Sequence, residues 1–236
     1  MKTAVISDIG LIRKRNEDSF LLKESLGLFV VCDGMGGHSG GDTASKMAVE
    51  IIDEMSEILQ SSEPLSFLQE AIMKANLDIW EMAQNNTELF EMGTTITAAV
   101  LRENRLTVAN IGDSSLFIIN SNGISKLTQD HTLAVEMYEN GLLNIDEIRD
   151  SGYNHILTRA LGIEPNVKID FVSETLSQGD KVLLCSDGLS DLLHEEEILS
   201  AFFEYNKGLQ DIANKLLENA LGKGGHDNIT IIVIEI

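Results

Sequence analysis

Apolar residues recur along this chain with two different periods, and the change from one to the other marks its elements. Short apolar runs at 3–7, 19–23 and 26–32 predict three β-strands near the start. Residues 44–59 and 66–83 then carry apolar positions three and four residues apart. That spacing predicts two amphipathic helices, each burying one face.

Strand-like patterns return in the middle of the chain. Runs at 94–101, 105–111 and 115–119 predict three further strands. Asn122-Gly123 follows the last of them and is a strong hairpin signal, because both residues accept the positive φ angles of a tight turn. These strands are therefore expected to pair with neighbours in sequence.

The last hundred residues are less regular. Residues 128–165 are polar and have no regular apolar period, which predicts a short helix and an irregular segment. Strands at 181–185 and 229–236 then bracket two amphipathic helices at 195–205 and 209–221. Strands in consecutive groups with helix pairs between them favour an α+β fold of antiparallel sheets covered by helices.

Composition narrows the class of protein. A hydrophobic fraction of 43% supports a buried core, and the chain lacks repeats and linkers, so 1–236 is predicted to be a single domain. The 38 acidic against 17 basic residues give a net charge of -21, which disfavours nucleic-acid binding. The sequence shows no signal peptide and no membrane span, which predicts a cytoplasmic protein. Cys32 and Cys185 lie inside apolar runs and are predicted to be buried free thiols.

Four aspartates stand where predicted strands end or begin: Asp33, Asp113, Asp187 and Asp227. One Asp-Gly pair is more typical of a turn, but four such sites on different strands favour a shared location. Convergent carboxylates stay ionised together only when cations lie between them. Oxygen ligands select Mg²⁺ or Mn²⁺ rather than zinc, and the sequence has neither a zinc pattern nor an EF-hand pattern.

A pair of such cations has a direct chemical use. Two metal ions roughly 3.5–4 Å apart lower the pKa of a shared water and stabilise an in-line displacement. Phosphoester hydrolysis also needs a clamp on the phosphoryl oxygens. Arg13 is the best local candidate, since a guanidinium binds phosphate bidentately, although taken alone the basic run 13–15 is more typical of a solvated surface.

Seven sequence blocks occur in the order expected of one family: GLIRKRNEDSF, VVCDGMGGHSGG, MGTTITAAV, VANIGDSS, LTRALG, LLCSDGLSDLL and GGHDNITIIV. They span residues 10 to 234, and the chain resembles the metal-dependent (type 2C, PPM) protein serine/threonine phosphatases of the compact bacterial type. The resemblance implies a β-sandwich of two antiparallel sheets with a helix pair on each outer face. It also implies metal ions at one end, between the sheets.

The resemblance also implies roles for individual residues. The metal ligands would be Asp33, Asp187, Asp227 and the carbonyl of Gly34, with Asp113 and Asp187 sharing a third cation. Glu17 and Asp18 would hold metal-bound waters, Asp18 being the candidate for closer contact, and Arg13 would bind the phosphate. The implied cofactors are two Mn²⁺ or Mg²⁺ ions, with a third site, and a mobile flap at about 138–158 would lie beside them.

The sequence departs from the family pattern in three places. Met35 stands where many eukaryotic members carry a histidine proposed as general acid, and His38 is the alternative proton donor. His38 could equally pack or cap at the entry of a helix. Ser115 and His226 replace residues that are often arginine, and neither is expected to bind metal.

The expected reaction is direct hydrolysis without a covalent intermediate. The chain has no Cys-x5-Arg loop, which argues against a tyrosine-phosphatase mechanism. The expected substrates are phosphorylated proteins, a bacterial Ser/Thr kinase among them, and the protein is expected to be a monomer. Two alternatives stay open: a metallophosphatase for small phosphorylated metabolites, and a non-catalytic scaffold that binds phosphoproteins.

Overall fold

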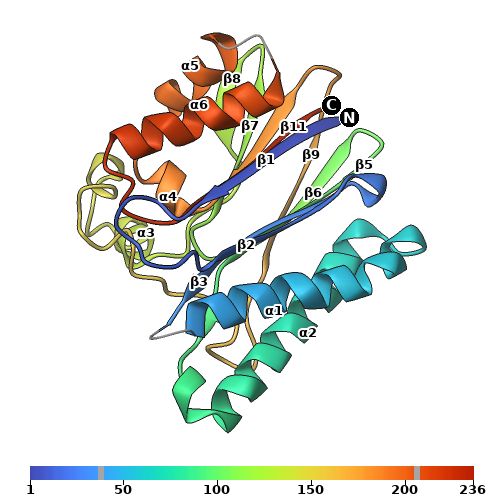
Figure 1. The fold of residues 1–236 in the computed structure, drawn as a ribbon, viewed down its shortest axis with the longest axis vertical. Coiled ribbons are helices and arrows are strands. Elements are labelled where there is room, and N and C mark those ends of the chain that lie inside the picture. Colours follow the sequence, from blue (N-terminus) through green and yellow to red (C-terminus); the bar gives the residue numbers. More distant parts are fainter. Residues whose placement is uncertain (37–39, 205–207) are drawn as a thin grey trace.

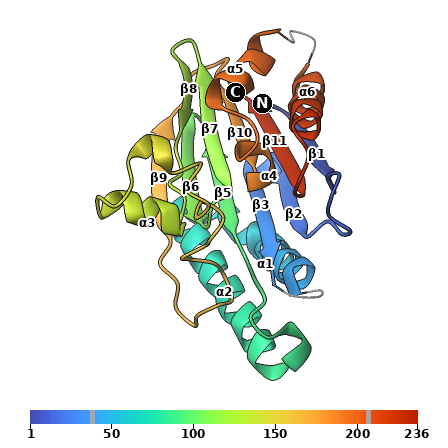
Figure 2. The same cartoon turned by 90° about the vertical axis from the view of Figure 1, so that its left-hand side faces the viewer.

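Two antiparallel β-sheets lie face to face, and a pair of helices covers the outer face of each (Figure 1). This computed structural model describes residues 1–36, 40–204 and 208–236. Turned by 90°, the view shows the two sheets and their helices as successive layers (Figure 2). The predicted α+β sandwich is therefore confirmed.

The first sheet has the strand order β1-β11-β10-β7-β8. Its strands are β1 (Lys2–Asp8), β7 (Ser115–Asn120), β8 (Gly123–Lys126), β10 (Lys181–Cys185) and β11 (Ile229–Glu235). Residues 229–234 are buried without interruption, as expected for a central strand whose sheet is covered on both faces. The first and last strands of the chain thus pair side by side.

The second sheet has the order β2-β3-β5-β6-β9, and the short strand β4 pairs with β3. Its strands are β2 (Asp18–Lys23), β3 (Leu28–Met35), β4 (Gly93–Thr94), β5 (Ile96–Arg102), β6 (Arg105–Ile111) and β9 (Asp170–Thr175). Strand β3 alternates with period two. Phe29 and Val31 face the first sheet, whereas Leu28, Val30 and Cys32 belong to the core beneath the helices.

Helices α1 (Gly40–Met55) and α2 (Pro64–Asn85) pack on the second sheet, and α5 (Glu195–Glu204) and α6 (Leu209–Gly222) pack on the first. The remaining helical elements are short: α3 (Leu133–Glu139), α4 (Asp187–Ser190) and the 3-10 turns Glu24–Leu26, Ser56–Gln60, Thr87–Leu89 and Ile145–Glu147. The described residues therefore form three apolar cores, one between the sheets and one under each helix pair. None of the helices within the described ranges has the length and apolarity needed to cross a membrane.

The element boundaries differ from the predicted ones where tertiary contacts intervene. Helix α1 begins at Gly40 rather than at residue 44, and β3 continues through Asp33 to Met35. The predicted strand 94–101 is interrupted at Thr95, which binds the backbone of Asp33. Strand β9 was not predicted, because this edge strand is half exposed and has no clear alternation. The predicted end of the helix at residue 205 lies outside the described residues.

Candidate active site

The predicted aspartates meet at one end of the sandwich. Asp18 on β2 and Asp33 on β3 are direct partners across two paired strands. Asp187 follows β10 as the first residue of α4, and Asp227 lies two residues before the neighbouring β11. Charge interactions connect Asp33 with Asp18, Asp187 and Asp113. Both sheets therefore contribute carboxylates to a single cluster.

Hydrogen bonds on both sides fix the backbone at Asp33. Its N–H donates to Thr95 Oγ1 at 2.9 Å, and its carbonyl accepts from the Thr95 N–H at 2.8 Å and from Thr94 Oγ1 at 2.9 Å. A β-carbon on Gly34 would lie 2.1 Å from the Gly41 carbonyl oxygen. Glycine is therefore required at this position, because α1 begins against the backbone of β3.

Asp18 and Asp187 each have a buried carboxylate oxygen without a hydrogen-bond partner. Asp18 is 8% exposed, and its other oxygen accepts a 2.7 Å hydrogen bond from Ser186 Oγ. A buried carboxylate that lacks a partner is costly, and a cation or a shared proton relieves that cost.

The pKa values of the clustered carboxylates also indicate that their buried charges are costly. Burial raises the pKa of Asp18 and that of Asp187 to about 6, and repulsion from Asp227 adds to both shifts. Burial, followed by neighbouring carboxylates, raises the pKa values of Asp33 and Asp113 well above the usual range. A divalent cation among these groups would replace the repulsion with attraction.

The chemistry of these carboxylates therefore fits cations that prefer oxygen ligands, although the side chains do not form a finished coordination geometry. In residues 1–36, 40–204 and 208–236, no three His, Cys, Asp or Glu side chains already stand in an arrangement that could hold a metal ion. The orphaned oxygens of Asp18 and Asp187 and the raised pKa values are the features that favour Mg²⁺ or Mn²⁺.

Arg13 lies at the edge of this cluster and forms an ion pair with Asp227, with 2.5 Å between Nη2 and Oδ2. This hydrogen bond is the main cause that raises the pKa of Arg13. Asn228, to which the sequence assigned no role, holds the loop that carries Arg13. Its side chain donates to the carbonyls of Ile9 and Arg15 at 3.0 and 2.9 Å, and accepts from the Glu17 N–H at 2.8 Å.

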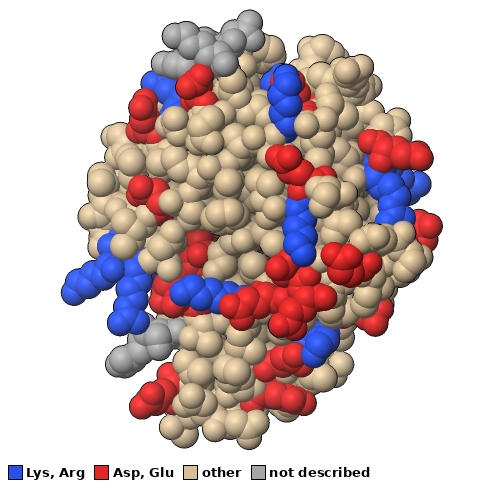
Figure 3. All heavy atoms as spheres, turned by 45° about the vertical axis from the view of Figure 1, so that its right-hand side comes forward, with Lys and Arg blue, Asp and Glu red and all other residues tan. Residues whose placement is uncertain are grey.

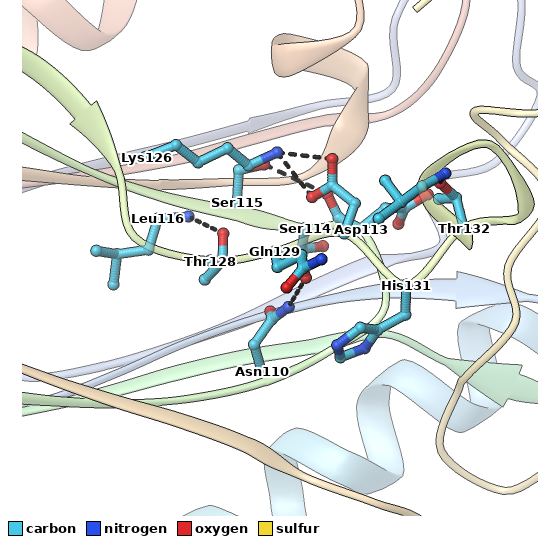
Figure 4. Close-up of polar contacts among 12 residues, drawn as sticks. Asn110, Asp113, Ser114, Ser115, Leu116, Lys126, Thr128, Gln129, His131 and Thr132 are labelled. Atoms are coloured by element: carbon cyan, nitrogen blue, oxygen red, sulfur yellow. Dashed lines mark hydrogen bonds and ion pairs between the residues drawn. The ribbon is translucent and has the colours of Figure 1, made fainter. Parts of the chain in front are cut away.

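The turn that carries Asp113 is braced by residues 128–131, which sequence reasoning also missed (Figure 4). His131 Nδ1 accepts the Gly112 N–H at 3.0 Å, and the His131 N–H donates to the Gly112 carbonyl at 3.0 Å. His131 Nε2 lies 3.1 Å from Asp170, so the proton resides on Nε2 when the ring is neutral. Burial and the nearby Arg159 lower the pKa of His131, which favours that neutral form.

A cavity of about 180 Å³ opens beside the cluster. Its lining includes Asp113, Asp130 and Asp191 on one side, and Arg149 and Asn154 from the predicted flap on the other. Burial, followed by repulsion from Asp187, raises the pKa of Asp191 to about 7, although much of this side chain faces solvent at the rim. Asp191 stands in the SDGLSD block, where no sequence pattern distinguishes it from an ordinary helix-surface residue.

The segment 138–158 is attached to the residues after α4 by polar contacts. Arg149 donates to the Asp191 carbonyl at 2.5 Å and lies 2.9 Å from His194 Nδ1. Asn154 donates to the Asp191 carboxylate at 3.3 Å. The predicted flap therefore lies against the cavity, where it could shape access to the carboxylates.

Three remaining residues complete the comparison with the sequence predictions. His38 lies outside the described residues. Cys32 and Cys185 are buried free thiols, as predicted. Burial raises the pKa of Cys185 to about 12, and that of Cys32 rises for the same reason, so neither supplies a thiolate nucleophile near neutral pH.

Comparisons with known proteins agree with the geometry. Residues 13–222 match the family model described as Protein phosphatase 2C. The chain is 34% identical over 236 residues to the serine/threonine phosphatase stp of Listeria innocua, covering 97% of this chain and 93% of that protein. The Mycobacterium tuberculosis serine/threonine phosphatase PstP/Ppp has a TM-score of 0.93 at 31% identity, over 100% of this chain and 98% of that one. The catalytic domain of PstP in complex with two manganese ions gives 0.87 at 32% identity, over 99% and 97%.

Proposed function

Because this chain belongs to the protein phosphatase 2C family, we propose that it removes phosphate from phosphoserine and phosphothreonine on proteins in a reaction that requires Mn²⁺ or Mg²⁺. One observation supports this most directly. Buried carboxylates from both sheets converge beside an arginine, and two of them carry oxygens that lack a protein partner. Such a site suits cations together with an anionic substrate.

The proposed ligands follow the cluster. Asp33, Asp187, Asp227 and the Gly34 carbonyl would hold two ions, and Asp113 with Asp187 would hold a third. When bound, such ions supply Lewis acidity, which lowers the pKa of water and offsets the charge of the phosphoryl group. Asp18, which accepts from Ser186, and Glu17 would orient water beside the ions.

Arg13 binds and orients the phosphoryl group in this proposal. Its guanidinium has five N–H donors, and the ion pair with Asp227 uses Nη2. The loop carrying Arg13 is fixed by Asn228, so the guanidinium is held near the carboxylates before substrate arrives. Preorganised donors of this kind stabilise charge without reorganisation during the reaction. The assignment of His38 as proton donor stays a prediction.

For the physiological substrate we propose only a class of molecule. Phosphorylated proteins are the substrate class, and a bacterial Ser/Thr kinase is a candidate among them. A monomeric state and a cytoplasmic location stay predictions from the sequence.

The test compares substrates and metals in one assay. We expect Mn²⁺-dependent hydrolysis of p-nitrophenyl phosphate and of phosphothreonine peptides, complete loss in excess chelator, and recovery when Mn²⁺ is restored. Faster turnover of free phosphoserine or nucleotides than of phosphopeptides would favour a small-metabolite phosphatase. Phosphopeptide binding without turnover would instead favour the scaffold alternative.

A further inference from the structure

Most basic side chains in this acidic protein already have a partner. Lys23 pairs with Asp53, Lys126 with Asp130 and Lys223 with Glu197, for example. Figure 3 shows one face on which most Lys and Arg side chains lie against Asp or Glu. Across the described ranges, only the side chains of Lys14, Arg15 and Arg105 among those of the Lys and Arg residues form neither a hydrogen bond nor an ion pair. Two of these three free cations, Lys14 and Arg15, directly follow Arg13 in the sequence.

The loop that carries Lys14 and Arg15 is held in place although its side chains face solvent. Asn228 fixes its backbone at Ile9 and Arg15, and the Leu11 N–H donates to the Gly225 carbonyl at 2.8 Å. The side chains of Leu11 and Ile12 are left 63% and 65% exposed. We call Leu11, Ile12, Lys14 and Arg15 the entry surface.

The positive charge of the entry surface lies next to the arginine proposed to bind phosphate, because Lys14 and Arg15 follow Arg13 directly in the chain. The whole chain is strongly negative, with 38 acidic and 17 basic residues, and a phosphorylated substrate is itself an anion. Free cations beside the site reduce this repulsion locally and attract anionic chains.

We propose that the entry surface selects phosphoprotein segments that carry acidic side chains close to the phosphoresidue. This inference rests on the proposed phosphatase function and adds a substrate preference to it. An extended peptide advances about 3.3–3.6 Å per residue, so positions within about three residues of a phosphate held at Arg13 can reach Lys14 and Arg15. Leu11 and Ile12 would contact apolar parts of the same segment.

The experiment uses three phosphothreonine peptides that differ only in flanking residues: acidic, uncharged or basic. The kcat/KM of each is measured for the Mn²⁺-loaded protein, for Lys14→Ala with Arg15→Ala, and for the charge reversal Lys14→Glu with Arg15→Glu. Arg105→Ala is the matched control, because Arg105 is the third free cation and begins β6, away from the entry surface. The neutral peptide is the internal reference for every variant.

We expect the unmodified protein to prefer the acidic over the neutral peptide by roughly two- to tenfold, mainly through KM, as two exposed ion pairs allow. The double alanine variant should bring that ratio to about one, the charge reversal should invert it, and Arg105→Ala should preserve it. Added salt should also shrink the preference, since the Debye length falls from about 10 Å at 0.1 M to about 3 Å at 1 M.

Equal turnover of the three peptides by the unmodified protein would overturn this inference and leave the phosphatase proposal standing. Absence of Mn²⁺-dependent turnover on every peptide and on p-nitrophenyl phosphate would overturn both. A preference that the double alanine variant retains would show that other residues select the substrate. Binding to phosphatidylserine vesicles that depends on Lys14 and Arg15, without any peptide preference, would assign the surface to membranes and also overturn it.

Discussion

The strand-end aspartates reach the cavity through Asp113, and the segment 138–158 lines it through Arg149 and Asn154, but the two regions are held in different ways. Asp33 lies on a strand whose preceding residues, Phe29 to Cys32, are fully buried. In contrast, 138–158 exposes large apolar side chains such as Leu142 and Ile145, and polar contacts of Arg149 and Asn154 attach it to the residues after α4. The groups that need fixed geometry therefore stand on the sheets, and the segment 138–158 forms an exposed rim beside them.

The carboxylate cluster and the segment 138–158 also contribute to the free energy of folding with opposite signs. The carboxylate cluster is a source of repulsion that the surrounding β-structure must oppose, as the raised pKa values of Asp33 and Asp187 indicate. The contacts of Arg149 are favourable but partly exposed, so each contributes little. Substitutions in the two regions should thus differ in size and in kind.

The largest effect is expected from Asp33→Asn. Loss of one proposed ligand should reduce Mn²⁺-dependent kcat by about a thousandfold or more, because bound metal supplies several kcal/mol to the transition state. The same change removes one charge from the buried cluster, so the Tm of the metal-free protein should rise. Asp78→Asn is the control, since Asp78 only pairs with Lys74 on the surface of α2. A lower metal-free Tm for Asp33→Asn would contradict the view of the cluster as mutually repelling.

A second, smaller effect concerns pH. Asp18 and Asp187 have folded-state pKa values of about 6, above their ordinary 3.8, so the folded state binds protons more tightly than the unfolded state. The stability of the metal-free protein should therefore increase as pH falls from 7 through 6 towards 4. His131, whose pKa is lowered, opposes this trend below about pH 6.5, and Asp170, whose pKa is lowered to about 2, opposes it only below about pH 4.

Thermal unfolding of chelator-treated protein measures this directly. We expect Tm to be a few degrees higher at pH 5 than at pH 7, and saturation with Mn²⁺ to abolish the difference. If the Tm of the metal-free protein decreased steadily as the pH was lowered, the buried carboxylates would not be a net source of repulsion in the folded state.

The smallest effect is expected in the flap. Arg149→Ala should raise the KM for a phosphopeptide by roughly two- to fivefold while kcat changes by less than about twofold, since partly exposed contacts are lost. Arg102→Ala is matched to it, because Arg102 also donates to a backbone carbonyl, that of Leu59, but lies outside the site. A thousandfold loss of kcat in Arg149→Ala would place the flap among the catalytic groups and remove the distinction drawn above.

Local periodicity was enough to predict most of the architecture. The alternation in β3 and the helical spacing in α1 and α2 reflect burial on one face, which is a property of each segment alone. The strand-end aspartates could likewise be singled out, because each follows or precedes an apolar run. The structure brings Asp33, Asp187, Asp113 and Asp227 together, while their roles as ligands stay predictions.

Contacts between distant residues were beyond the reach of periodicity. Asn228 binds residues more than two hundred positions earlier in the chain, and His131 joins Gly112 to Asp170. The early start of α1 at Gly40 depends on the close approach of Gly41 to Gly34, which no helix propensity describes. Strand β9 was missed for the opposite reason, since an exposed edge strand has little apolar pattern to detect.

The position of β11 has a consequence for how this protein is made. A ribosome produces β1 first and β10 much later, and the gap between them is filled only by residues 229–235. Asp227 and Asn228 are synthesised immediately before β11. Until then the chain lacks the Asp227 carboxylate of the cluster and the Asn228 side chain that fixes the loop carrying Arg13. The site is therefore expected to be complete only after β11 has been synthesised and inserted between β1 and β10.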